Sequence, residues 1–70
     1  MAPRKGGGVA EEREVIYEFV RIGGAVKVTA VDTASGTEAT IVGDPLAGEA
    51  TLKRLARQKL DYVMRRKTEG

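Results

Sequence analysis

The sequence predicts an α+β fold: a three-stranded antiparallel β-meander packed against one long C-terminal α-helix (β-β-β-α). Two runs rich in β-branched residues flank Gly23-Gly24, and a third run follows the turn-like stretch "TASG". Residues 49–67 then repeat apolar side chains with the period of a helix. A chain of 70 residues has room for one small core, so we expect a single domain.

The chain ends are predicted to lie outside that domain. Residues 1–13, "MAPRKGGGVAEER", combine a proline, three consecutive glycines and charges without apolar periodicity, which is typical of a disordered tail. We therefore place the folded domain at residues 14–67 and a frayed C-terminus at residues 68–70. The tail has no apolar signal-peptide core, and no apolar run approaches a membrane span. Together with the absence of cysteine, these features predict a cytoplasmic protein.

The first hairpin is predicted from residues 14–22, a strand by their β-branched and aromatic content. Gly23-Gly24 suits a two-residue type I′ turn, which requires a positive φ at both positions. Such a turn sets the register: Ile22 faces Ala25, and Phe19 faces Val28.

A second hairpin is predicted from a loop at residues 33–36 and a strand at residues 37–42. Its register places Ala30 opposite Ala39. Because the side chains of a strand alternate between its faces, the two registers together collect one continuous apolar face. The predicted core face comprises Val15, Tyr17, Phe19, Val26, Val28, Ala30, Ala39 and Ile41.

The helix is predicted to begin near Asp44, a good N-cap that precedes Pro45, although Gly48 weakens the next turn and favours a later start. Lys59 falls inside the apolar stripe of the helix and is expected to extend its methylene groups over the sheet edge. A buried lysine with a lowered pKa is the alternative. The residues predicted to face the sheet are Leu52, Leu55, Ala56, Leu60 and Val63.

The second face of the sheet carries more apolar side chains than a solvated face needs. Ordinary β-propensity explains such residues, and so does a partner surface. We predict a protein-interaction module that self-associates through the open sheet face or edge, with a homodimer or a small protein as the partner. The predicted interaction face comprises Ile16, Val20, Ile22, Val31 and Val42.

Positive charge gathers in the helix, where residues 48–70 hold seven basic and three acidic side chains. Basic residues near a helix C-terminus complement the helix dipole, which explains part of this cluster. The alternative function is a nucleic-acid-binding (RNA or DNA) accessory protein, although no nucleic-acid-binding motif supports it. Its expected phosphate contacts are Lys53, Arg54, Arg57, Arg65, Arg66 and Lys67.

Enzyme chemistry has little support in the sequence. The chain has no histidine and no cysteine, and its only serine, Ser35, lies in a predicted turn. Nucleophile–base pairs that use histidine are therefore excluded, and so is the usual donor set for structural zinc. We predict no catalytic residue, no metal site, no cofactor and no membrane partner.

The stretch from residue 13 to residue 67, with "EVIYEF", "VKVTAVD…GTE", "IVG" and "LARQKLDYV", resembles a family of short uncharacterised alphaproteobacterial proteins, a domain of unknown function. Some members carry the label serine hydroxymethyltransferase. That label implies a large pyridoxal-phosphate fold, which 70 residues cannot form, so we treat it as a mislabelling. The resemblance implies no activity of its own.

Overall fold

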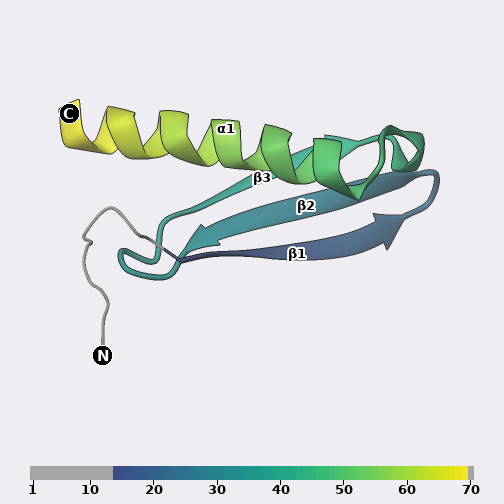
Figure 1. The fold of residues 1–70 in the computed structure, drawn as a ribbon, viewed down its shortest axis with the longest axis horizontal. Coiled ribbons are helices and arrows are strands. Elements are labelled where there is room, and N and C mark those ends of the chain that lie inside the picture. Colours follow the sequence, from purple (N-terminus) through teal and green to yellow (C-terminus); the bar gives the residue numbers. More distant parts are fainter. Residues whose placement is uncertain (1–13, 70) are drawn as a thin grey trace.

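The computed structural model of the chain describes residues 14–69 and confirms the predicted architecture (Figure 1). Strands β1 (Val15–Ile22), β2 (Ala25–Asp32) and β3 (Glu38–Gly43) form an antiparallel sheet in the order β1-β2-β3. A 3₁₀ turn, η2 (Pro45–Ala47), leads into helix α1 (Glu49–Glu69). The predicted N-terminal tail lies outside the described residues, and the frayed end at residues 68–70 stays a prediction.

Both predicted strand registers are confirmed. Ile22 pairs with Ala25, Phe19 with Val28, and Ala30 with Ala39. The first turn differs from its prediction, because only Gly23 has a positive φ, of 59°. One positive φ at the first central position is the pattern of a type II′ turn, which also matches the twist of the flanking strands.

Polar groups close the second hairpin. The buried Asp32 carboxylate accepts hydrogen bonds from the backbone N–H of Ser35 (3.2 Å) and from its hydroxyl (2.7 Å). The N–H of Asp32 donates to the carbonyl oxygen of Thr37 (2.8 Å). Ser35 therefore stabilises the turn. After this turn, β3 begins at Glu38, one residue later than predicted.

The sequence signals around the helix start act on two separate elements. Asp44 caps η2, and its side chain accepts a hydrogen bond from the N–H of Leu46 (2.9 Å). Gly48, with a φ of 90°, then changes the direction of the chain and separates η2 from α1. Gly43 leaves space for Leu52, because a Cβ at Gly43 would meet that side chain. The late start of the helix is confirmed.

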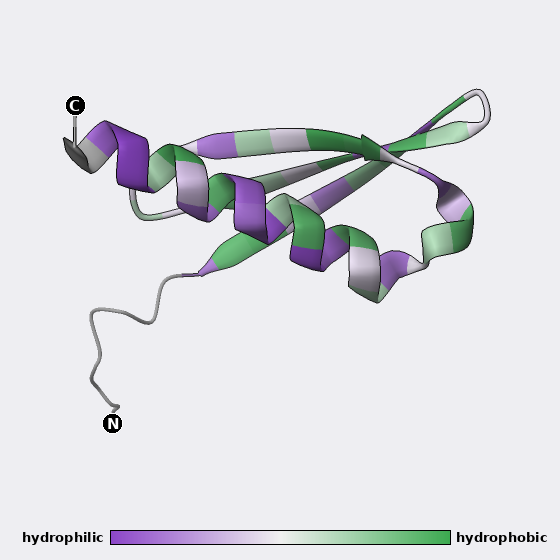
Figure 2. Cartoon of the chain, turned by 90° about the horizontal axis from the view of Figure 1, so that it is seen from above, coloured by the Kyte–Doolittle hydropathy of each residue, from purple (hydrophilic) through white to green (hydrophobic). Residues whose placement is uncertain are grey.

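The core lies between α1 and only two of the three strands, since α1 packs on β2 and β3. Figure 1 shows β1 as the strand farthest from the helix. Figure 2 shows hydrophobic and hydrophilic residues alternating along α1, with hydrophilic ones prevailing towards its C-terminus. The buried apolar cluster comprises Val26, Val28, Ala30, Ala39, Leu52, Ala56 and Leu60, and Val15, Tyr17, Ile41, Val63 and Met64 pack against it.

Two predicted core residues are wrong. Phe19 is 36% exposed, because it belongs to the strand that α1 does not cover. Leu55 is 40% exposed: it lies about 60° around the helix from Leu52, at the margin of the stripe. The prediction placed the helix across the core face of all three strands, whereas α1 packs on β2 and β3 only.

This asymmetry predicts unequal effects of one substitution at two positions of α1. Leu60→Ala should lower the free energy of unfolding by about 2–5 kcal/mol, because Leu60 is 1% exposed and its removal leaves a cavity. Leu55→Ala changes helix propensity equally but removes a half-exposed side chain, so we expect a loss below about 1 kcal/mol. Urea denaturation of both variants measures the difference, and equal losses would contradict the position assigned to α1.

Candidate interaction surfaces

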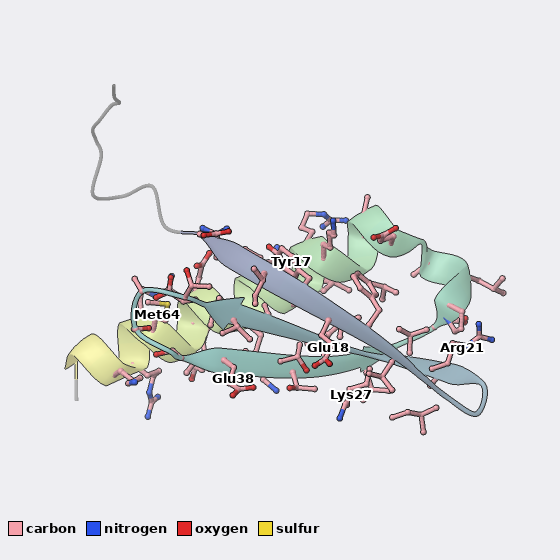
Figure 3. The ribbon with its side chains drawn as sticks, turned by 90° about the horizontal axis from the view of Figure 1, so that it is seen from below. Tyr17, Glu18, Arg21, Lys27, Glu38 and Met64 are labelled. Atoms are coloured by element: carbon pink, nitrogen blue, oxygen red, sulfur yellow. The ribbon has the colours of Figure 1, made fainter. Side chains whose placement is uncertain are left out.

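The outer face of the sheet, the side opposite α1, carries the predicted interaction residues. Ile16 and Ile22 are about half exposed, and Val42 is 66% exposed. Val20 is also exposed, whereas Val31 is partly buried by its neighbours. Figure 3 views the sheet from this side, with Glu18, Lys27 and Glu38 among the strands. Among the described elements, none covers this face.

The strand register divides the outer face into two apolar groups. Ile16 lies beside Val31, and Val20 lies in one row with Lys27 and Val42. Between these rows lie Glu18, Thr29 and Thr40. The hydroxyls of the two threonines are 3.1 Å apart. The apolar side chains are therefore exposed but not contiguous within one chain.

The second surface is the free edge of β1, formed by the backbone groups that point away from β2. The N–H of Thr33 donates to the carbonyl oxygen of Glu14 (3.1 Å), in register with the β1–β2 ladder. Because backbone groups alternate direction along a strand, even-numbered residues of β1 bond to β2. The N–H and C=O groups of Val15, Tyr17, Phe19 and Arg21 consequently face outwards.

A groove accompanies this edge on the helix side of the sheet. It has a volume of about 410 Å³ and is lined by Phe19, Arg21, Val26, Pro45, Glu49 and Leu52. Its walls combine apolar side chains with one arginine and one glutamate. The groove exists because α1 begins over β2 and β3 and leaves the inner side of β1 partly open.

Tyr17 occupies the inner side of β1 farther along the strand, where two cations approach it. The Lys53 ammonium lies 5.5 Å from the centre of the Tyr17 ring. Hydrogen bonding to Tyr17 and then to Asp61 raises the pKa of the Arg57 guanidinium above its usual value. Tyr17 therefore links β1 to α1 through these long side chains as well as through its packing against the buried apolar cluster.

The free edge of β3 is arranged differently, because lysine side chains reach it. Lys59 Nζ donates to the carbonyl oxygen of Thr40 (2.8 Å), as expected for a lysine that extends over the sheet edge. Lys67 Nζ donates to the hydroxyl of Thr37 (3.1 Å), just before β3. A lysine on an edge strand hinders pairing with another strand, since pairing would displace or desolvate its charge.

The six predicted phosphate-contacting residues are distributed around α1. Four have partners within the chain: Lys53 lies 3.8 Å from Glu49, Arg57 lies 3.2 Å from Asp61, Arg66 contacts Tyr62, and Lys67 contacts Thr37. Arg54 and Arg65 are both exposed. They are 11 residues apart, which places them on the same side of the helix and roughly 16 Å from one another.

The described residues show few other chemical groups that could act together. Among the described side chains, those of residues 14–67, no three histidine, cysteine, aspartate or glutamate side chains come together as metal ligands would. Over the same range, no helix has the length and apolarity to span a bilayer. The sequence predicted association through an open sheet face or edge, but it did not predict the groove or which edge is open, since both depend on where α1 lies. Arg21, which follows Tyr17 and Phe19 on the inner side of β1, was the available signal.

The contact of Lys59 with β3 yields a prediction about that edge. Lys59→Ala should leave the melting temperature nearly unchanged, because Lys59 is exposed, but should uncover the Thr40 carbonyl. We expect larger assemblies of this variant at high protein concentration by light scattering. Lys53→Ala removes the same charge from the other side of α1 and is the control. Equal assembly of both variants would attribute the effect to charge and not to the edge.

Comparisons with known proteins identify one relationship. No curated protein and no solved structure matches the chain. One family model does, over residues 12–67, and its description is domain of unknown function (DUF6898). The match spans the whole described sheet and nearly all of α1. The chain belongs to this family of domains of unknown function.

Proposed function

We propose that the chain is a non-enzymatic protein-interaction module that self-associates through its sheet. One observation supports this proposal: the sheet exposes Ile16, Val20, Ile22 and Val42 on a face that none of the described elements covers. These side chains are not contiguous within one chain, and a second copy that brought them together would complete an apolar patch of the kind that marks interaction sites. Ile16, Val20 and Ile22 belong to β1 itself, so its free edge adjoins this part of the face, whereas Val42 lies on β3.

Self-association suits this region better than a strongly charged partner does. The outer face carries both signs of charge: Glu18 lies diagonally across from Lys27, and Glu38 lies farther along the sheet, opposite Val31. Such a surface neither attracts nor repels a copy of itself strongly. A domain of this length also gains from oligomerisation, because its own core is small. The family resemblance adds the proposal that the protein acts in a bacterial cytoplasm.

A second candidate function is nucleic-acid binding by α1. The alignment of Arg54 and Arg65 favours it, because two exposed guanidinium groups on one side of a helix can contact two phosphates of the same nucleic acid. Against it, four of the six basic side chains have partners within the chain. Binding that uses few free cations should be weak.

The solution mass at two salt concentrations tests the first proposal. We expect a mass near twice that of the 7.5 kDa chain at both low and high salt, because apolar and backbone contacts depend little on screening. Light scattering after size exclusion provides the measurement. A monomer at both salt concentrations, up to the highest protein concentration reached, would contradict self-association.

Titration with a fluorescent single-stranded RNA and a DNA duplex tests the second candidate. If α1 binds phosphates, the affinity should fall with a log–log salt slope of about one per phosphate contacted. Arg54→Ala/Arg65→Ala should then lower the slope by about two. The same change at Lys27 and Arg21, which lie on strands, is the matched control. Absence of binding at low salt would exclude this function.

A further inference from the structure

We propose that the free edge of β1 pairs antiparallel with the β1 edge of a second copy, so that two chains form one continuous six-stranded sheet. This inference rests on the proposed self-association and specifies its surface. It commits to the edge of β1, and not to packing between outer faces.

Backbone direction decides how two copies can pair. The outward N–H and C=O groups belong to the odd-numbered residues of β1, as the Glu14–Thr33 hydrogen bond indicates. In an antiparallel ladder, residues that exchange hydrogen bonds lie directly opposite each other and on the same face. Odd residues must therefore face odd residues. The inner faces of both copies, and hence both helices, then lie on the same side of the joined sheet.

The position of α1 leaves room for this arrangement. Because α1 packs on β2 and β3, its axis lies about two strand spacings from the joining line. With a spacing of about 4.8 Å, the two helix axes would be roughly 19 Å apart. Helices in direct contact lie about 8–10 Å apart, so the copies do not collide. The gap is filled by side chains of the two β1 strands, which include the half-exposed Phe19.

The two edges of the sheet differ in the way that this pairing requires. Lys59 contacts Thr40 of β3, and Lys67 contacts Thr37, the residue before β3. A β3–β3 contact would bring these cations of two copies together. Along β1, an eight-residue strand without proline, the only cation is Arg21. The unprotected edge is therefore the one beside the groove and the exposed phenylalanine.

One register suits the side chains of β1 best, with Phe19 opposite the partner's Phe19. It places Tyr17 opposite the partner's Arg21, a cation–aromatic pair on the inner face. On the outer face, Ile16 lies opposite the partner's Ile22. A shift by two residues in one direction brings Glu18 opposite the partner's Glu18, which is repulsive. The opposite shift places Ile16 opposite the partner's Gly24 and loses the apolar contact.

Amide exchange of the unmodified chain tests this inference. At a concentration where light scattering shows the dimer, the N–H groups of Tyr17, Phe19 and Arg21 should exchange at least about tenfold more slowly than in a dilute sample. The outward N–H groups of Thr40 and Val42 on the β3 edge are the internal control and should not change. Measurement by NMR assigns each rate to its residue.

A single-cysteine variant locates the two-fold axis, since the natural chain contains no cysteine. Phe19→Cys should form an intermolecular disulfide on mild oxidation, because directly opposite hydrogen-bonded residues lie about 5.5 Å apart at Cα, a distance that suits a disulfide. Val42→Cys, on the strand at the other edge, should remain mostly monomeric under the same conditions. A disulfide of Val42→Cys without one of Phe19→Cys would overturn the inference.

A charge on the outer face separates edge pairing from face packing. Val20 would lie opposite the partner's Glu18, so Val20→Lys should preserve the dimer and strengthen it by up to about fivefold. Packing between outer faces would instead bury the new charge and abolish the dimer. A dimer that loses association in this variant, with fast exchange at Tyr17 and Phe19, would overturn edge pairing and leave self-association intact. A monomer under all conditions would overturn both.

Discussion

A single helix can cover only about two strands, and the arrangement of this domain follows from that constraint. A helix is about 10 Å wide and neighbouring strands lie about 4.8 Å apart. Here α1 packs on β2 and β3 through Leu52, Ala56 and Leu60. The alanines at positions 30, 39 and 56 are small, which lets helix and sheet approach closely. The third strand is left outside this contact.

The consequences for β1 are chemical as well as geometric. Tyr17 packs against the margin of the apolar cluster and is also contacted by the long side chains of Lys53 and Arg57. Phe19 has no such cover and lines a groove. On the other side of the helix, Lys59 contacts Thr40 of β3 and Lys67 contacts Thr37 just before β3, because α1 packs over this strand. The position of one helix thus produces one protected edge and one open edge.

The sequence was sufficient for the features that depend on local periodicity. Gly23-Gly24 fixed the first register, and the alternation of β-branched residues fixed the second, so all three strands and their pairing follow from nearest-neighbour rules. The late start of α1 after Gly48 was also readable, because a glycine with positive φ ends one helical turn before the next begins.

The features that failed depend on the lateral position of the helix. Phe19 and Leu55 both have the periodicity of core residues, yet they are exposed. Periodicity indicates the face on which a side chain lies, but not whether another element covers that part of the face. For the same reason, the groove could not be predicted. The residues predicted as an interaction face share one side of the sheet, but their division into two groups by Glu18, Thr29 and Thr40 required the register of all three strands together.

That division bears on the meaning of the outer face. Within one chain, Ile16 and Ile22 lie near opposite ends of β1, too far apart to form one patch. In the proposed edge pairing, two antiparallel copies of β1 with Phe19 at the centre would bring each Ile16 beside the partner's Ile22, so the isolated side chains would become cross-strand pairs. Such pairs contribute stability on a sheet face that stays in contact with water. The exposed isoleucines would then need no covering layer, and one edge contact would account for Ile16, Ile22, the groove and the half-exposed Phe19.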